Sequence, residues 1–275
     1  MTLTINSTLT LVNSVKMPIF GLGTYLLTDN RGQKAIEFAL EIGYRLIDTA
    51  TLYNNEKIVG NALRNSKIPR DEVFITSKVW NSDQGYSRTI NAFNKSLSNL
   101  GVDYMDLYLI HWPVEGKWKD TWQALEELYN KGKVRAIGVS NFYIPHLEEL
   151  LQIASIKPMV NQIEFHPFLY KKEVLEYCQE KGIVLESYAP LTHGYKFNEI
   201  KTPHFLQIME KYNKSVAQLM LRWNIQHGNV IIPKSINPSH IRENAEIFDF
   251  TILIDDMQYL DSINEDFHSD WDPSD

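Results

Sequence analysis

Short apolar runs alternate with longer amphipathic stretches from about residue 18 to residue 245. The runs are rich in Val, Ile and Leu without strict apolar–polar alternation, which is typical of parallel strands buried on both faces. Eight runs fit this description: 19–21, 45–47, 73–75, 105–110, 136–139, 159–162, 184–188 and 230–232. Eight strand–helix units in series predict a closed (β/α)8 barrel, an α/β fold of the TIM-barrel type.

The stretches between the runs carry helix signals. In 215–227, Ser215 is a candidate cap, Gln218 sits at the capping-box position, and Gly228 follows as a stop. Ahead of the first unit, residues 9–12 and 14–16 are expected to pair through Asn13 as a small β-hairpin. No Pro/Gly/Ser-rich linker or low-complexity segment interrupts this pattern, so we expect one domain over residues 1–275.

The charge and composition of the chain bear on whether it binds nucleic acid or membranes. The net charge of −7 gives no support for a nucleic-acid or anionic-membrane partner. No apolar run approaches the roughly 20 residues of a membrane helix, and the first seven residues lack the basic and apolar regions of a signal peptide. We expect a cytoplasmic protein that acts as a monomer on a small molecule.

Four polar residues lie where the predicted strands end. Asp48, Lys78 and His111 each end an apolar run, and Tyr53 follows Asp48 by five residues. Singly, each has an ordinary structural explanation: a helix cap, a loop aromatic, a solvated lysine or a core histidine. The carboxyl ends of barrel strands converge on one face, where such enzymes carry out their chemistry. Finding all four there favours a catalytic site.

These side-chain types suit the reduction of a carbonyl group. A free tyrosine has a pKa of about 10, and a nearby ammonium is expected to lower it by stabilising the phenolate. Asp48 can keep Lys78 protonated, and a neutral His111 can donate a hydrogen bond to a carbonyl oxygen. The four residues include no hydride source, so a nicotinamide cofactor is needed.

Ordered motifs then give a resemblance to a known family. The matching stretches are 17–18, 21–24, 48–50 with Tyr53 and 55–56, 77–78, 107–113, 138–142, 161–164 with 166–167, 187–191, 232–235 and 243–244. On these motifs the chain resembles the aldo-keto reductase family over about residues 15–249. Residues matching Asp48, Tyr53, Lys78 and His111 form the catalytic tetrad of that family. The short tail after Phe250 is similar to that of bacterial members.

The resemblance also implies a cofactor cleft. Ser140, Asn141 and Gln162 would bond the nicotinamide carboxamide, and Tyr188 would stack on its ring. The full set of cofactor positions is Gly23, Thr24, Ser140, Asn141, Gln162, Tyr188, Ala189, Leu191, Lys234, Ser235, Ile236, Asn237, His240, Glu243 and Asn244. A helix begun by Asn237 and Pro238 beside Lys234 is a candidate phosphate site. NADPH is the expected cofactor, with NADH possible because His240 stands where family members that prefer NADPH carry Arg.

The substrate pocket is expected to be walled by Tyr25, Trp80, His111 and Trp112, and Trp271 in the tail is a candidate for closing it. The leading prediction is NADPH-dependent reduction of aldehydes or ketones to alcohols, with Tyr53 as the general acid. One alternative is a non-catalytic or weakly catalytic binding or structural protein on the same scaffold. A metal-dependent hydrolase is a third reading, but the chain lacks a His-x-His pair, and no metal site is expected.

Overall fold

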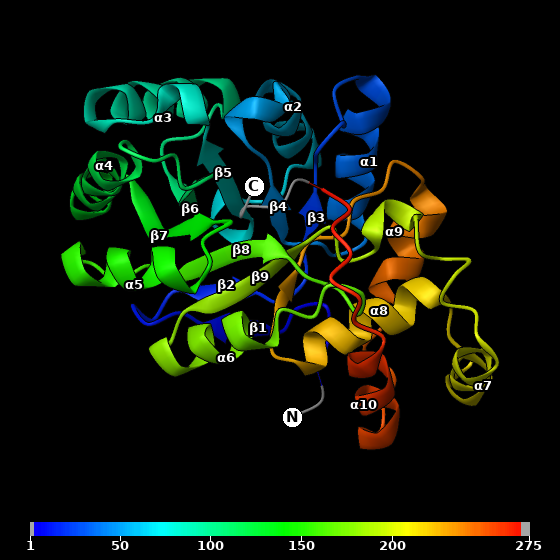
Figure 1. The fold of residues 1–275 in the computed structure, drawn as a ribbon. Helices are drawn as coiled ribbons and strands as arrows, with labels where there is room; N and C mark the ends of the chain where they lie inside the picture. The colour runs from blue at the N-terminus through cyan, green and yellow to red at the C-terminus, as the bar shows by residue number, and fades with distance from the viewer. Residues whose placement is uncertain (1–2, 271–275) are drawn as a thin grey trace.

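Eight parallel strands lie side by side in chain order, with helices outside them (Figure 1). The computed structural model describes residues 3–270, so Trp271 lies outside the described residues. The strands of this sheet are β3 (Leu22–Gly23), β4 (Leu46–Asp48), β5 (Phe74–Val79), β6 (Met105–Ile110), β7 (Val134–Ser140), β8 (Val160–Glu164), β9 (Val184–Tyr188) and β10 (Val230–Ile231). The helices are α1 (Asn30–Glu41), α2 (Glu56–Ser66), α3 (Tyr86–Leu100), α4 (Trp118–Asn130), α5 (Ile144–Ile153), α6 (Lys172–Lys181), α7 (Pro203–Tyr212), α8 (Val216–Gln226), α9 (Pro238–Ala245) and α10 (Ile254–Ser262).

The first and last strand regions meet and confirm the predicted barrel. A parallel bridge joins Phe20 to Ile231, with Gly21 N donating to Ile231 O at 2.9 Å. The strand predicted at 19–21 is therefore shifted: β3 starts at Leu22, and residues 19–21 form the seam with β10. A Cβ at Gly21 would lie 2.2 Å from the Leu46 side chain, so only glycine lets the backbone pass here.

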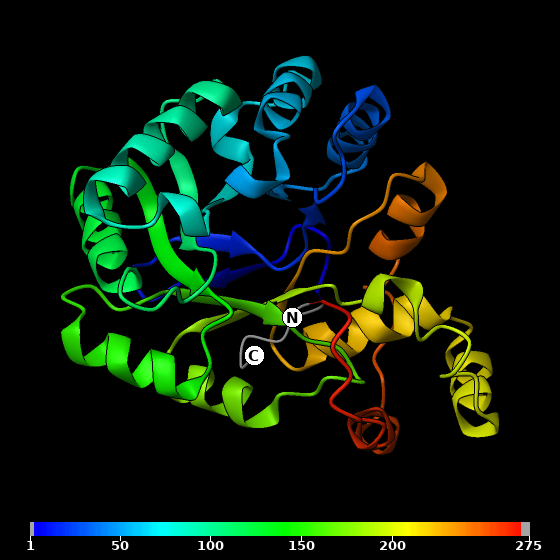
Figure 2. The same ribbon diagram turned by 45° about the horizontal axis from the view of Figure 1, so that its top comes forward.

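The predicted helix at 215–227 is confirmed as α8. The Ser215 hydroxyl accepts from Gln218 N, and the Gln218 side chain accepts from Ser215 N, which completes the capping box. Every residue of α8 from Val216 to Ile225 is buried. α8 packs against β10 and α9, and Figure 2 shows it lying between α9 (orange) and α10 (red).

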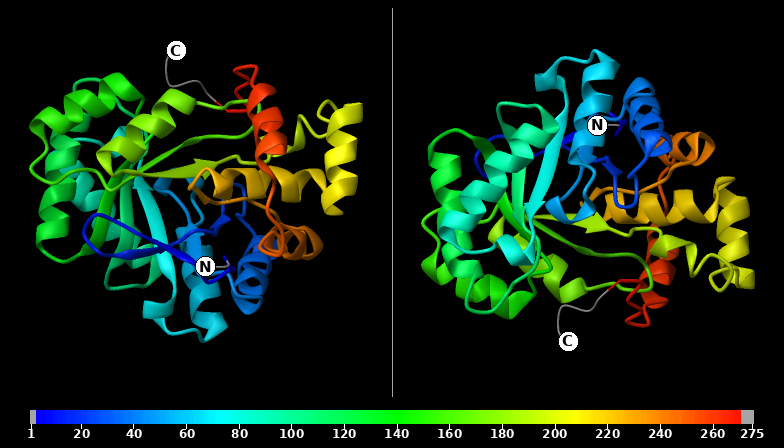
Figure 3. Two further views of the ribbon diagram at one scale, coloured as in Figure 1. Left: turned by 90° about the horizontal axis from the view of Figure 1, so that it is seen from below. Right: turned by 90° about the horizontal axis from the view of Figure 1, so that it is seen from above.

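The predicted hairpin is present, with its arms displaced outward. Its strands are β1 (Thr8–Thr10) and β2 (Lys16–Pro18), so residues 11–15 form the turn instead of Asn13 alone. Within the turn, the Asn13 side chain accepts from Val15 N, and Ser14 is left-handed with a φ of 69°. Asn13 also donates to Arg135 O near the start of β7. The hairpin (blue in Figure 3) thus lies at the amino-terminal ends of the strands.

The opposite, carboxyl-terminal end of the barrel is consequently the end that can carry the chemistry. Among residues 3–270, no helix has the length and apolar character needed to span a membrane.

Candidate active site

The four predicted tetrad residues come together at the carboxyl ends of β4, β5 and β6. Asp48 ends β4, Lys78 lies in β5, and His111 directly follows β6. Tyr53 ends the short 3-10 helix Thr51–Tyr53. The Lys78 ammonium donates to Asp48 Oδ1 at 2.6 Å, to Thr49 O at 3.1 Å and to the Tyr53 hydroxyl at 3.4 Å. One buried cation therefore connects the carboxylate to the phenol.

Aromatic rings surround this group. The Tyr53 and His111 rings are 5.8 Å apart between centroids, and Trp80 lies 5.1 Å from His111 on the same measure. Tyr25 is 5.1 Å from Tyr53 and 43% exposed, which places it at the rim. Trp112 follows His111, and its carbonyl oxygen accepts from the Gln84 side chain. Tyr25, Trp80 and His111 thus form one aromatic cluster with Tyr53, and Trp112 is next to His111 in the chain.

The charge state of the Lys78–Asp48 pair follows from its surroundings. Burial lowers the pKa of Lys78, but the charges of Asp48 and Tyr53 outweigh it and the net shift is upward. Burial raises the pKa of Asp48 against the opposing effect of Lys78. The proton stays on Lys78, whose pKa rises from an already basic value.

The expected lowering of the Tyr53 pKa was wrong in its net direction. Burial raises the pKa of Tyr53 to about 12, and the Lys78 charge only partly opposes it. Loss of hydration penalises the phenolate more than one ammonium at 3.4 Å compensates. His111 agrees with expectation, because burial and then the Lys78 charge hold its pKa well below the usual range and keep the imidazole neutral.

The residues expected to hold a nicotinamide adjoin the tetrad. The Ser140 hydroxyl donates to Gln162 O, and Asn141 Nδ2 donates to His111 O at 3.0 Å. The Tyr188 hydroxyl donates to Asn141 Oδ1 at 3.0 Å. Gln162 donates directly to Asp48. These four side chains and the tetrad therefore form one connected network.

Four further predicted cofactor positions have structural features of their own. A Cβ at Gly23 would lie 2.7 Å from Ile232 O, so the barrel backbone itself requires glycine there. The Thr24 hydroxyl is buried, donates to Asp48 O and accepts from the Asn55 side chain. Ala189 has a φ of 44° just after β9, and Ile236 packs against the core.

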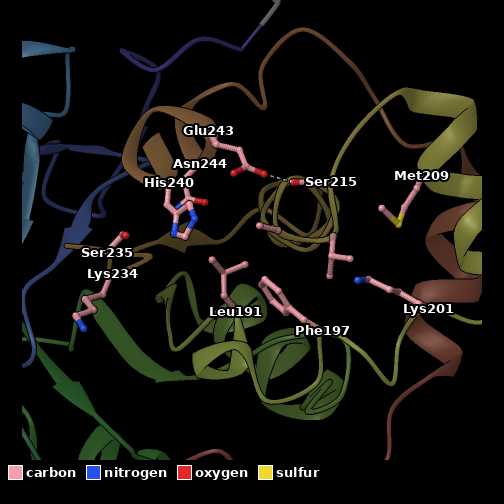
Figure 4. Close-up of a pocket in the computed structure, with 12 residues that line it drawn as sticks. Leu191, Phe197, Lys201, Met209, Ser215, Lys234, Ser235, His240, Glu243 and Asn244 are labelled. Carbon is pink, nitrogen blue, oxygen red and sulfur yellow. Dashed lines mark hydrogen bonds between the residues drawn. The ribbon is translucent and has the colours of Figure 1, made fainter. Parts of the chain in front are cut away.

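A pocket of about 310 Å³ gathers the remaining cofactor positions (Figure 4). Its lining includes six predicted residues: Leu191, Lys234, Ser235, His240, Glu243 and Asn244. Lys234 forms no ion pair with any described residue. Asn237 caps α9 beside it by accepting from Ser239 N at 3.0 Å. A free cation next to a capped helix start fits the phosphate of a dinucleotide.

The other wall of this pocket consists of residues that the sequence did not predict to lie there. Phe197, Lys201 and Met209 line it, as do residues 215–217 at the start of α8. The Ser215 hydroxyl donates to Glu243 at 2.5 Å, shown as a dashed line in Figure 4. These residues lack a family motif. They come from the segment before α7, from α7 and from the start of α8, and α8 packs against α9 at the site.

Glu186 in β9 was also missed, although a lone acid inside an apolar run was a visible signal. It is fully buried and accepts from the Gln162 side chain at 2.7 Å. Among residues 3–270, no group of three or more His, Cys, Asp or Glu side chains is arranged to hold a metal ion.

Comparison with known proteins agrees with this geometry. The model of the Aldo/keto reductase family matches residues 20–265. The chain is 54% identical to the glyoxal reductase of Bacillus subtilis, covering 95% of this chain and 94% of that protein. Among solved structures, an aldo-keto reductase from a Medee basin deep-sea metagenome library has a TM-score of 0.91 at 46% identity, covering 95% and 96% of the two chains. A Bombyx mori aldo-keto reductase in complex with NADP has a TM-score of 0.89 at 32% identity, covering 97% and 95%. The chain belongs to the aldo/keto reductase family.

Proposed function

We propose that this protein reduces small aldehydes and ketones to alcohols with NADPH, with Tyr53 as the proton donor. The observation that carries the proposal is the buried Lys78–Asp48 pair with its ammonium 3.4 Å from the Tyr53 hydroxyl. The similarity to the Bacillus subtilis glyoxal reductase supports short aldehydes, including dicarbonyls, as substrates. All of these groups come from one chain, so the proposed site needs no residue of a second copy.

Each tetrad residue has a distinct part in the proposed reaction. When bound, the reduced nicotinamide supplies the hydride. His111 is neutral and donates a hydrogen bond to the carbonyl oxygen, which orients and polarises the substrate. Tyr53 gives its proton to that oxygen, and Lys78 stabilises the phenolate left behind. Asp48 keeps Lys78 charged. The high pKa of Tyr53 makes Lys78 essential, because without it the phenolate would be costlier still.

The cofactor would occupy the cleft from His111 to α9. Ser140, Asn141, Gln162 and Tyr188 would hold the nicotinamide end. Lys234, Ser235 and the start of α9 would hold the phosphate of the adenosine ribose, with an added charge at that phosphate favouring NADPH over NADH.

His240 lines the same pocket and offers a single hydrogen bond where Arg would offer a planar fork. We therefore expect His240→Arg to tighten NADPH, by roughly 1.5–3 kcal/mol at most for a charge-assisted contact, and to leave NADH binding nearly unchanged. Dissociation constants for both cofactors in both proteins measure this. An Arg variant with no gain for NADPH would remove His240 from the phosphate site.

Oxidation of NADPH in the presence of aldehydes tests the proposed activity. We expect steady turnover with an aromatic aldehyde and with glyoxal, and slower turnover when NADH replaces NADPH. Tight NADPH binding without turnover of any aldehyde in a broad panel would instead favour the binding-protein alternative.

A further inference from the structure

Glu186 is a buried carboxyl group that the proposed reaction does not use. It lies in β9 opposite Gln162 of β8, and its side chain has no exposed surface. Burying an acid is costly unless it is paired or protonated. The cation of the cluster, Lys78, is already paired with Asp48 at 2.6 Å. Glu186 therefore needs a purpose other than balancing charge.

Its contact is with the side-chain amide of Gln162. Gln162 Nε2 donates to Asp48 Oδ2 at 2.9 Å and to Glu186 Oε2 at 2.7 Å. A primary amide has two N–H donors, so both are used. Rotating the amide would turn its carbonyl oxygen toward the Asp48 carboxylate, which would repel it. The two acids thus fix which end of the amide faces away from them.

The other end of the amide remains available. No described residue forms a hydrogen bond with Gln162 Oε1. Gln162 O accepts from Ser140, and Asn141 is the next residue along that loop, so the amide belongs to the proposed nicotinamide end of the cleft. A carboxamide bound there carries N–H donors that need an acceptor.

We propose that Glu186 is a positioning residue, which with Asp48 holds the Gln162 amide so that its carbonyl oxygen accepts an N–H of the nicotinamide carboxamide. This inference rests on the proposed cofactor. Loss of Glu186 would leave the amide held by Asp48 alone, which would loosen its orientation and weaken that contact.

The electrostatics agree with such a role. The charged groups that face Glu186 are Asp48 and Lys78, and its other contact is the neutral Gln162. Burial and then the Asp48 charge raise the pKa of the Glu186 carboxyl to about 8. At neutral pH, Glu186 thus keeps its proton while still accepting through Oε2. It can position Gln162 without drawing Lys78 away from Asp48 and Tyr53.

Binding of two ligands to three proteins tests this proposal. The ligands are NADP⁺ and 2′-phospho-ADP-ribose, which lacks the nicotinamide. The proteins are the parent, Glu186→Met and the matched control Glu186→Gln, whose amide oxygen still accepts from Gln162. We expect Glu186→Met to bind NADP⁺ about tenfold more weakly, the effect of one lost hydrogen bond. Its affinity for 2′-phospho-ADP-ribose should be unchanged. Glu186→Gln should bind both ligands as the parent does.

An equal change in affinity for both ligands in Glu186→Met would indicate a merely structural role and overturn the proposal. Unchanged affinity for both ligands would also overturn it. If Glu186→Met does not fold, the ¹⁵N–¹H signals of the Gln162 side-chain amide decide. They should shift as Glu186 ionises in the parent and lose that shift in Glu186→Gln. Signals that respond identically in both proteins would reject the contact.

These outcomes are separable from the proposed activity. If Glu186→Met selectively loses NADP⁺ affinity but the parent protein reduces no carbonyl compound, only the proposed function is defeated. If the parent turns over carbonyl compounds in a Tyr53-dependent way but Glu186→Met shows no selective loss of NADP⁺ affinity, only the role of Glu186 is defeated.

Discussion

Lys78 and Asp48 form an ion pair inside the barrel, where neither side chain is more than 2% exposed. Such a pair is weak evidence for stability by itself, because removing both charges from water is costly. Removing one partner is a different matter, since it leaves the other charge buried alone. The catalytic and structural consequences of changing Lys78 are therefore linked.

Lys78→Met should lose most reductase activity and unfold more easily, by about 3–5 kcal/mol as for a broken buried pair. Activity and denaturant unfolding measure the two effects. Lys234→Met is the control, because it removes an exposed cation and should weaken NADPH binding without a comparable loss of stability. Parental turnover in Lys78→Met would contradict the role given to its charge.

Glu186 should make stability depend on pH. Its folded pKa of about 8 lies above its ordinary value of 4.5, so between these values the folded protein holds a proton that the unfolded chain has released. The stabilising contribution of this proton to the free energy of unfolding is thus fully present below pH 4.5. It is lost as pH rises to about 8, at about 1.4 kcal/mol per pKa unit. The glutamine in Glu186→Gln cannot ionise, so the melting temperature of this variant relative to that of the parent should rise from pH 5 to pH 8. A constant difference would show that Glu186 does not titrate there.

Among the elements, α8 contributes its first residues to the lining of the proposed cofactor pocket. Ser215 caps α8 and also donates to Glu243 of α9. Ser215→Ala should cost about 0.5–2 kcal/mol of stability, because α8 loses its cap. It should also weaken NADPH binding, because Glu243 loses its orienting contact. Asp29→Ala is matched to it, since Asp29 caps α1 and does not line the pocket. Unfolding and NADPH titrations should show similar destabilisation but lower NADPH affinity only in Ser215→Ala. Equal NADPH affinity in both variants would remove Ser215 from the pocket's function.

The elements differ in how far the sequence could predict them. α8 was predictable because its caps and apolar stripe are local signals. The arms of the hairpin were not, because the turn contacts a distant part of the chain: Asn13 donates to Arg135 O. The first strand was misplaced because residues 19–21 pair across the closing seam, with the last strand of the barrel.

At the scale of the whole molecule, the hairpin occupies one end of the barrel and the tetrad the other. The tetrad was predictable because the carboxyl ends of parallel strands must converge. The direction of the Tyr53 pKa was not, since it depends on how burial balances against Lys78 in three dimensions. The pocket wall at Phe197 and Ser215 escaped prediction for a similar reason, because long-range packing assembles it.

Tyr53 is the proposed proton donor in NADPH-dependent carbonyl reduction. Turnover of an aromatic aldehyde, measured with NADPH affinity in Tyr53→Phe and Tyr25→Phe, tests it most directly. Tyr25 lies 5.1 Å away, ring to ring, and makes a matched control. We expect Tyr53→Phe to lose about 10²–10⁴ in kcat with NADPH affinity nearly unchanged, and Tyr25→Phe to keep most of its kcat. Near-parental turnover in Tyr53→Phe would contradict the claim.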